Sequence, residues 1–148
     1  MIKKITFTDV LSAPNWPEMK VEYEKEGHTE GFPPCVPNLE VYKKLEGIGV
    51  LHVFGAYLRE KLIGFISVLH TPASHYEIPL CVSESFFVFK EHRHTGAGLK
   101  LLREAENFAG NHSAGLLVSA PYGGTLAAVL EKKEDYRQTS QVFFKRCV

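Results

Sequence analysis

The stretch from Ser83 to Ala109 constrains the fold of this 148-residue chain more than any other. Its first part, Phe86-Phe87-Val88-Phe89, is aromatic and β-branched, which predicts a strand. Beyond Gly98 the apolar residues recur at helical spacing, which predicts an amphipathic helix. Strand and helix are joined by the glycine-bearing turn Arg93-His94-Thr95-Gly96-Ala97-Gly98. We therefore expect a strand, a tight turn and a helix in direct succession.

The turn is suited to an anion. Glycines let the backbone approach a ligand closely, and the first turn of a helix offers unpaired N–H groups with a partial positive charge. We therefore expect a phosphate or pyrophosphate to bind here. Two common phosphate motifs do not match, because Gly98 is followed by Leu99-Lys100-Leu101. A Walker A loop needs Gly-Lys-Ser/Thr at this place, and a dinucleotide fingerprint needs a third glycine near position 101.

Composition limits the partners. With 17 basic and 17 acidic side chains and 45% hydrophobic residues, we expect one folded domain spanning residues 1–148 and no nucleic-acid partner. No run approaches the roughly 20 apolar residues of a membrane span, so we expect no membrane partner and a soluble cytoplasmic protein. The three cysteines form no Cys-x-x-Cys pair, and His92 and His94 lack further ligands nearby, so we expect no metal site.

The rest of the chain supplies further strands and helices. The expected strands span residues 2–8, 50–58, 62–69, a segment ending at Phe89, 116–119 and 141–145. The expected helices span about 17–26, 38–46, the segment from Gly98 to a stop at Gly110-Asn111, and 125–133. This order predicts an α/β fold with a mixed sheet flanked by helices, and not a doubly wound alternation. The glutamates of the first helix indicate either a solvated face or an anionic entrance for a cationic substrate.

The turn also resembles a known motif. Arg93-His94-Thr95-Gly96-Ala97-Gly98 is similar to the R/Q-x-x-G-x-G/A signature of the GNAT (Gcn5-related) N-acetyltransferase superfamily, and roughly residues 50–146 resemble its core. The resemblance implies the GNAT acyl-CoA N-acyltransferase fold, with a mostly antiparallel mixed sheet and a V-shaped splay between its fourth and fifth strands. It implies an enzyme that transfers an acetyl group from acetyl-CoA to a primary amine by direct attack in a ternary complex.

Several alternatives stay open beside that implication. The acceptor is a small molecule, a polyamine or a peptide, and a homodimer is compatible with the sequence. A non-catalytic acyl-CoA-binding or sensor module with the same fold is the main alternative, and an interaction protein that kept only the fold is another, because fold alone does not establish an activity.

The resemblance also assigns cofactor-binding residues. It implies that backbone N–H groups of the turn hold the pyrophosphate of acetyl-CoA; the turn residues are Arg93, His94, Thr95, Gly96, Ala97 and Gly98. It further implies that Phe87, Val88 and Phe89 pair with the pantetheine arm, opposite a partner strand at 116–119. One freed amide, of Phe87 or Val88, would then polarise the thioester carbonyl.

Transfer to an amine needs a base, because an alkylammonium is almost wholly charged at neutral pH. Glu84 is the candidate base, and strand alternation predicts that it shares a face with Phe86 and Val88; the alternative is a purely structural carboxylate. The family's usual general acid is a tyrosine in the helix after the fifth strand, where this chain has Glu131. Tyr122, in the flexible loop before that helix, is the best substitute.

Overall fold

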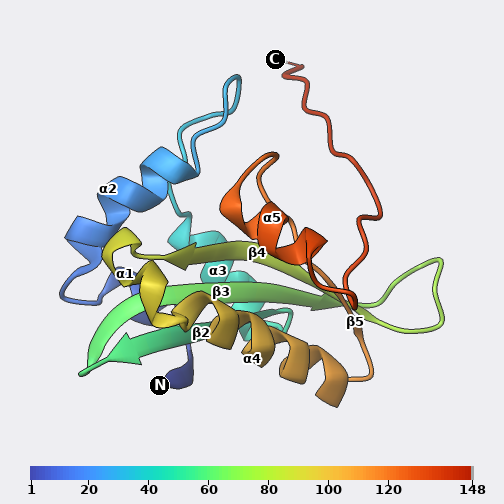
Figure 1. Ribbon diagram of the computed structural model, residues 1–148, viewed down its shortest axis with the longest axis horizontal. Helices are drawn as coiled ribbons and strands as arrows, with labels where there is room; N and C mark the ends of the chain where they lie inside the picture. The colour runs from blue at the N-terminus through green and yellow to red at the C-terminus, as the bar shows by residue number, and fades with distance from the viewer. Residues whose placement is uncertain (148) are drawn as a thin grey trace.

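The computed structural model describes residues 1–147, which form a five-stranded sheet with helices on both faces (Figure 1). The strands are β1 (Ile2–Ile5), β2 (Leu51–Leu58), β3 (Lys61–Thr71), β4 (Leu80–Val88) and β5 (Gly115–Leu117). The helices are α1 (Phe7–Leu11), α2 (Trp16–Glu26), α3 (Leu39–Gly47), the 3₁₀ helix η1 (Lys90–Thr95), α4 (Ala97–Asn111) and α5 (Thr125–Glu131).

The strands lie in the sheet in chain order, β1-β2-β3-β4-β5. The first three neighbouring pairs are antiparallel, whereas β4 and β5 are parallel. This confirms the predicted mixed, mostly antiparallel sheet. A Cβ added at Gly64 of β3 would lie 2.7 Å from the carbonyl oxygen of Phe87, so glycine is needed there for β3 and β4 to pair closely.

The core lies on both faces of the sheet. On one face α4 packs through Leu101, Ala105 and Phe108 against β2, β3 and β4. On the other face the helices α1, α2 and α3 bury an aromatic cluster centred on Phe65, which is 0% exposed. The predicted helices at 17–26 and 38–46 are confirmed as α2 and α3. Both place apolar side chains in the aromatic cluster.

The amino-terminal strand is shorter than predicted, because a helix cap follows it. The Thr6 hydroxyl accepts from the amide of Asp9 at 3.1 Å, and the Asp9 carboxylate accepts from the amide of Thr6 at 2.7 Å. This reciprocal capping box starts α1 at Phe7. The predicted strand therefore stops at Ile5, and the part of the prediction that covers residues 6–8 is wrong.

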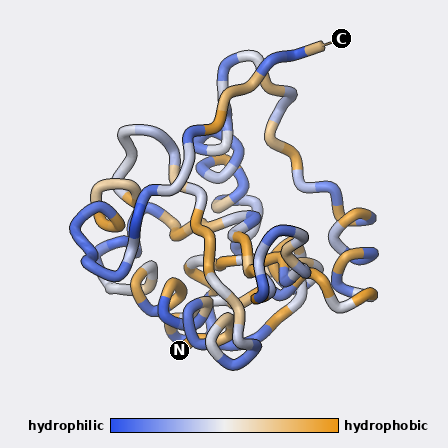
Figure 2. The backbone as a smooth tube through the Cα atoms, turned by 90° about the vertical axis from the view of Figure 1, so that its right-hand side faces the viewer, coloured by the Kyte–Doolittle hydropathy of each residue, from blue (hydrophilic) through white to orange (hydrophobic). Residues whose placement is uncertain are grey.

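The predicted final strand at 141–145 is also wrong. Within the described residues the chain after Glu131 has no helix or strand, and the side chains of Val142 and Phe143 are 91% and 87% exposed. Figures 1 and 2 show this segment leaving the body of the molecule and ending beside the loop that joins α2 and α3. There the ring of Phe144 stacks on that of Phe32, with centroids 3.8 Å apart.

Among the helices of the described residues, none combines the length and the apolar character that crossing a membrane requires.

Candidate functional site

The turn between β4 and α4 is built around Gly96. Its φ of +78° lies in the left-handed region that glycine adopts most readily, and it reverses the chain so that α4 begins at Ala97. Gly96 is also the N-cap residue and has no side chain with which to cap the helix. The amide of Ala97 donates to the Thr95 hydroxyl at 3.3 Å and that of Lys100 to the carbonyl oxygen of Gly96 at 3.1 Å. The amides of Gly98 and Leu99 are therefore the first-turn donors available to an outside acceptor.

Gly98 has a different reason to be glycine. A Cβ added there would lie 3.7 Å from Val88 Cγ2 and 4.0 Å from Phe86 Cζ, which is ordinary contact, and its φ is not positive. Glycine within a helix costs about 1 kcal/mol relative to alanine. The packing of the chain therefore does not require this glycine, whereas a phosphate group held close to the backbone would.

Arg93 holds the turn in place. Its Nε donates to the carbonyl oxygen of Val88 at 2.9 Å, and its Nη2 pairs with the carboxylate of Glu26 on α2. The guanidinium also lies 6.0 Å from the ring centroid of Phe87. The structure therefore gives the Arg93 side chain a role inside the protein, where it fixes the turn against β4 and α2.

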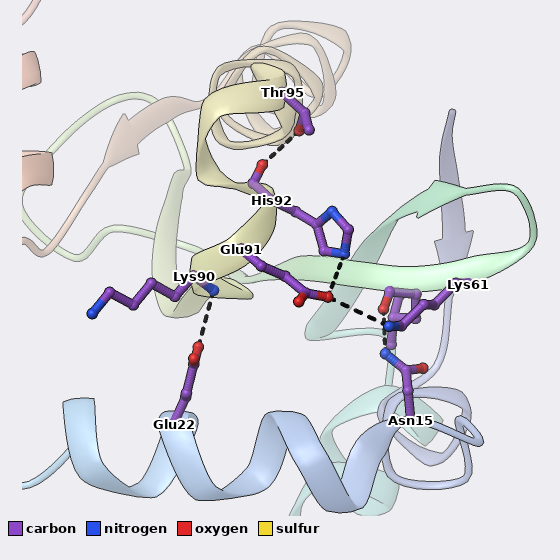
Figure 3. A network of polar contacts seen from close by, with 8 residues as sticks. Asn15, Glu22, Lys61, Lys90, Glu91, His92 and Thr95 are labelled. Carbon is purple, nitrogen blue, oxygen red and sulfur yellow. Dashed lines mark hydrogen bonds and ion pairs between the residues drawn. The ribbon is translucent and has the colours of Figure 1, made fainter.

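Further contacts fix the same turn, as Figure 3 shows. Glu22 on α2 accepts from the backbone amide of Lys90 at 2.9 Å. Glu91 lies 3.5 Å from Lys61 Nζ and 2.9 Å from His92 Nε2. Two of the acidic side chains of α2, Glu22 and Glu26, therefore hold the turn, which favours a structural role for them over an anionic entrance.

The edge of β4 opens beside this turn. Strand β5 pairs with β4 only at Leu80, Cys81 and Val82, and beyond that point the amide of Ser119 donates to the Ser83 hydroxyl at 2.9 Å. From there to the end of β4, the described strands supply no partner on this edge. This is the predicted splay between the fourth and fifth strands.

The register decides which amides face the open edge. The amide of Ser85 donates to Ser67 Oγ at 3.1 Å and that of Phe89 to the carbonyl oxygen of Ile63 at 2.8 Å, so both point toward β3. Alternate residues of a strand direct their N–H groups to opposite edges, so the amide of Phe87 also faces β3.

The amides of Phe86 and Val88 therefore face the open edge. Of the two residues predicted to supply the freed amide, Phe87 therefore faces β3, and Val88 remains the candidate. Sequence reasoning missed Phe86, although counting back two residues from Val88 along the strand would have found it.

Glu84 occupies a β-bulge. Ser67 of β3 pairs with Ser85 and Val68 pairs with Ser83, so Glu84 is an extra residue in β4. The bulge turns its carboxylate toward α3, where the hydroxyl of Tyr42 donates to Oε1 at 2.9 Å. Ser67 Oγ donates to Oε2 at 2.7 Å.

The bulge overturns one prediction about Glu84. Phe86 and Val88 pack on the α4 side of the sheet, whereas Tyr42 belongs to the cluster on the opposite side. Glu84 therefore does not share a face with Phe86 and Val88, because the bulge interrupts the alternation on which that prediction rested.

Two further groups, Tyr23 and Cys35, lie close enough to feel the charge of Glu84, as Tyr42 does. Burial raises the pKa of the Tyr23 and Tyr42 phenols, and the negative charge of Glu84 raises each of them further. Burial also raises the pKa of the Cys35 thiol, followed by the charges of Glu24 and Glu84. All three groups therefore stay protonated at neutral pH. They lie near a carboxylate that still has access to solvent, which is an arrangement that can accept a proton from a cationic amine.

Among residues 1–147 the structure gives the predicted acid no positioned partner. Tyr122 lies in the turn before α5 with its side chain fully exposed, at 105%, and Glu131 at the end of α5 is exposed as well. Tyr136 is half-buried and its hydroxyl donates to Glu106 at 2.9 Å. The acid role of Tyr122 stays a prediction. Within residues 1–147 no histidine, cysteine, aspartate and glutamate side chains gather in threes as a metal site would need.

Comparison with known proteins identifies the family. A model of the acetyltransferase (GNAT) family matches residues 16–132, which include the turn, the open edge and the bulge. The chain belongs to the GNAT acetyltransferase family. None of the curated proteins compared with it matches in sequence.

Solved structures of GNAT acetyltransferases share the fold. An aminoglycoside acetyltransferase from an uncultured soil metagenomic sample is 19% identical, with a TM-score of 0.72 over 99% of this chain and 95% of that one. A ribosomal-protein-alanine N-acetyltransferase from Brucella melitensis biovar Abortus 2308 is 17% identical, with a TM-score of 0.69 over 98% of each chain. The aminoglycoside N-acetyltransferase AAC(6')-Iy, solved in complex with CoA, is 17% identical, with a TM-score of 0.66 over 99% and 98%.

Proposed function

We propose that this GNAT protein transfers an acetyl group from acetyl-CoA to a primary amine, by direct attack of the amine on the thioester in a ternary complex. The observation that carries the proposal is Gly98, a glycine in the first turn of α4 that the packing of the chain does not require. It lies beside the open edge of β4, where the amides of Phe86 and Val88 face outward.

The proposal gives each part of the site one task. The first-turn amides of α4 and those from His94 to Gly98 hold the pyrophosphate. The open edge of β4 pairs with the pantetheine arm, and the amide of Val88 donates to the thioester oxygen as negative charge develops there, an interaction worth roughly 3–4 kcal/mol in comparable sites. Glu84 accepts the proton of the attacking ammonium, directly or through water.

The acceptor amine can be narrowed to two classes of compound for testing. Similar structures include enzymes named for aminoglycosides and one named for a ribosomal protein, so both a polyamine-like small molecule and a peptide amino terminus belong in the first panel of acceptors. The carboxylate of Glu84 among neutral phenols favours a cationic amine of either kind.

The second candidate function is an acyl-CoA-binding module without turnover. The observation that favours it is the full exposure of Tyr122, which leaves the site without a positioned acid among the described residues. A thiolate leaving group can be protonated by water, so this absence does not prevent transfer.

The test is calorimetric titration of acetyl-CoA into three proteins: the wild type, Gly98→Val and Gly110→Val. Both substitutions place valine in α4, and a Cβ at Gly110 meets nothing within 4 Å, so this second variant controls for helix propensity. We expect wild type and Gly110→Val to bind alike and Gly98→Val to bind at least tenfold more weakly, with thermal unfolding confirming that both variants fold.

Release of free thiol with aminoglycosides, polyamines and peptides then separates the two functions. Thiol release with any acceptor supports the transferase, whereas binding without release supports the binding module. Failure of the wild type to bind acetyl-CoA would overturn both.

A further inference from the structure

A group of buried hydroxyls lies under Glu84. Ser67 in the middle of β3 is 0% exposed and Tyr42 on α3 is 8% exposed. A buried hydroxyl must find hydrogen-bond partners, and an apolar residue at either place would avoid that requirement. Both hydroxyls instead donate to the carboxylate of Glu84, at 2.7 Å and 2.9 Å.

The direction of each proton in this group can be deduced. A hydroxyl has one proton and two acceptor positions, and a carboxylate has only acceptor positions. Ser67 therefore gives its proton to Glu84 and accepts two others, from the amide of Ser85 at 3.1 Å and from the Ser85 hydroxyl at 2.6 Å. Tyr42 gives its proton to the other carboxylate oxygen. All of these hydrogen bonds thus point toward Glu84.

The two donors are held by features that do not depend on Glu84. The ring of Tyr42 stacks on that of Phe7 with centroids 3.8 Å apart and an 8° angle between the planes. Ser67 sits in the interior of β3, between paired neighbours on both sides. Removing either hydroxyl would leave the carbon framework in place.

A purely structural role does not account for this arrangement. Glu84 has access to solvent, and water alone could solvate an exposed carboxylate without any buried donor. Both oxygens are nevertheless fixed by protein donors, and a bulge in β4 is needed to bring the side chain within their reach. Buried polar groups of the chain therefore serve to orient one carboxylate.

We propose that Tyr42 and Ser67 are positioning residues that hold the carboxylate of Glu84 aimed at the acceptor amine. This inference rests on the proposed transferase function, in which Glu84 takes the proton of the attacking ammonium. Tyr42 and Ser67 act through Glu84 and do not touch the reacting atoms themselves.

Loss of either donor should change kcat without changing the binding of acetyl-CoA. A carboxylate that loses a fixed hydrogen-bond donor also adopts orientations that do not face the amine, so proton transfer from the amine slows. Acetyl-CoA is proposed to bind at the turn before α4 and at the open edge of β4, so the KM for acetyl-CoA should stay at its wild-type value.

The experiment compares Tyr42→Phe, Ser67→Ala and Glu84→Gln with wild type. The matched control is Tyr136→Phe, which removes another tyrosine hydroxyl that donates to a glutamate at 2.9 Å, but on α4. We expect Tyr42→Phe to lower kcat about tenfold, the loss typical of one hydrogen bond to a charged group, with the KM for acetyl-CoA unchanged. The kcat of Tyr136→Phe should stay at the wild-type value.

A second comparison separates positioning from stability. If Tyr42 acts only through Glu84, adding Tyr42→Phe to Glu84→Gln lowers the rate no further. The inference is wrong if Tyr42→Phe keeps the wild-type kcat, or if Glu84→Gln remains fully active. Should Ser67→Ala fail to fold, Tyr42→Phe decides alone, because its ring keeps the stacking on Phe7. A wild type that neither binds nor consumes acetyl-CoA would instead refute the proposed function.

Discussion

The chain up to Asn111 and the chain from His112 to Cys147 differ sharply in packing. The first region contains both apolar clusters, and its last buried side chain is that of Ala109. In the second region no described side chain is buried, although it includes β5 and α5. The first region is thus shaped by its own core, whereas the second is placed by a three-residue strand pairing, by the half-buried Ala114 and Leu116 against that core, and by a few side-chain contacts.

The difference does not come from a lack of apolar residues. Val142 and Phe143 are as hydrophobic as the residues of the core, yet both are almost fully exposed. The second region borders the open edge of β4, where we propose that acetyl-CoA binds. We infer that a bound ligand completes the packing of this region, whereas the first region packs without one.

The largest expected effect tests the packing contrast directly. Phe65→Ala removes a fully buried ring that contacts four others, those of Phe7, Trp16, Tyr23 and Phe87, and should cost about 3–5 kcal/mol of unfolding free energy. Phe143→Ala removes an exposed ring and should cost less than about 0.5 kcal/mol. Urea denaturation of both variants measures the difference. Equal losses would show that the second region is packed after all.

A smaller effect should appear when the ligand is added. Acetyl-CoA should slow backbone hydrogen exchange several-fold in residues 115–131, which border its proposed site, because binding suppresses local opening. The paired strands β2 and β3 should change little. Mass spectrometry of peptides from both regions provides the measurement, with CoA-free protein as reference. Protection confined to β2 and β3 would remove the basis for treating the second region as ligand-dependent.

The smallest expected effect concerns pH and belongs to the first region. Burial lowers the pKa of His52 on β2 from its ordinary value of 6.5, and the charges of Lys4, His70 and His112 lower it further against a hydrogen bond to Gly49 that raises it. The unfolded chain then binds this proton more readily than the folded one, so stability is present above pH 6.5 and is lost as pH falls below it.

We therefore expect the unfolding free energy to fall between pH 7.5 and pH 5.5, and to fall less in His52→Gln. His75→Gln, at an exposed histidine outside this cluster, is the matched control and should behave as wild type. Denaturation curves at the two pH values give the comparison. An identical pH dependence in His52→Gln and wild type would exclude His52 as the source.

The elements and the site differ in how far the sequence predicts them. Helices α2, α3 and α4 and the turn before α4 follow from local spacing and from glycine, and they lie where we expected them. The side of the sheet that Glu84 faces does not follow from local spacing. A single extra residue in β4 reverses the alternation, and no sequence pattern indicates where that residue lies. Residues 141–145 have the composition of a strand, but a strand also needs a neighbour with which to pair.

Helix α2 has a consequence for kinetics that reaches beyond its packing. Its Glu26 binds the turn at which we place the pyrophosphate, its Glu22 binds the start of η1 before that turn, and its Tyr23, which follows Glu22 on the same helix, lies near the group around Glu84. A shift of α2 caused by one substrate would thus be felt by the other. Such coupling is reciprocal, so acetyl-CoA would change the affinity for the amine by the same factor as the amine changes the affinity for acetyl-CoA. Initial-rate measurements should then show that the apparent KM of each substrate depends on the concentration of the other, as it would not for independent sites.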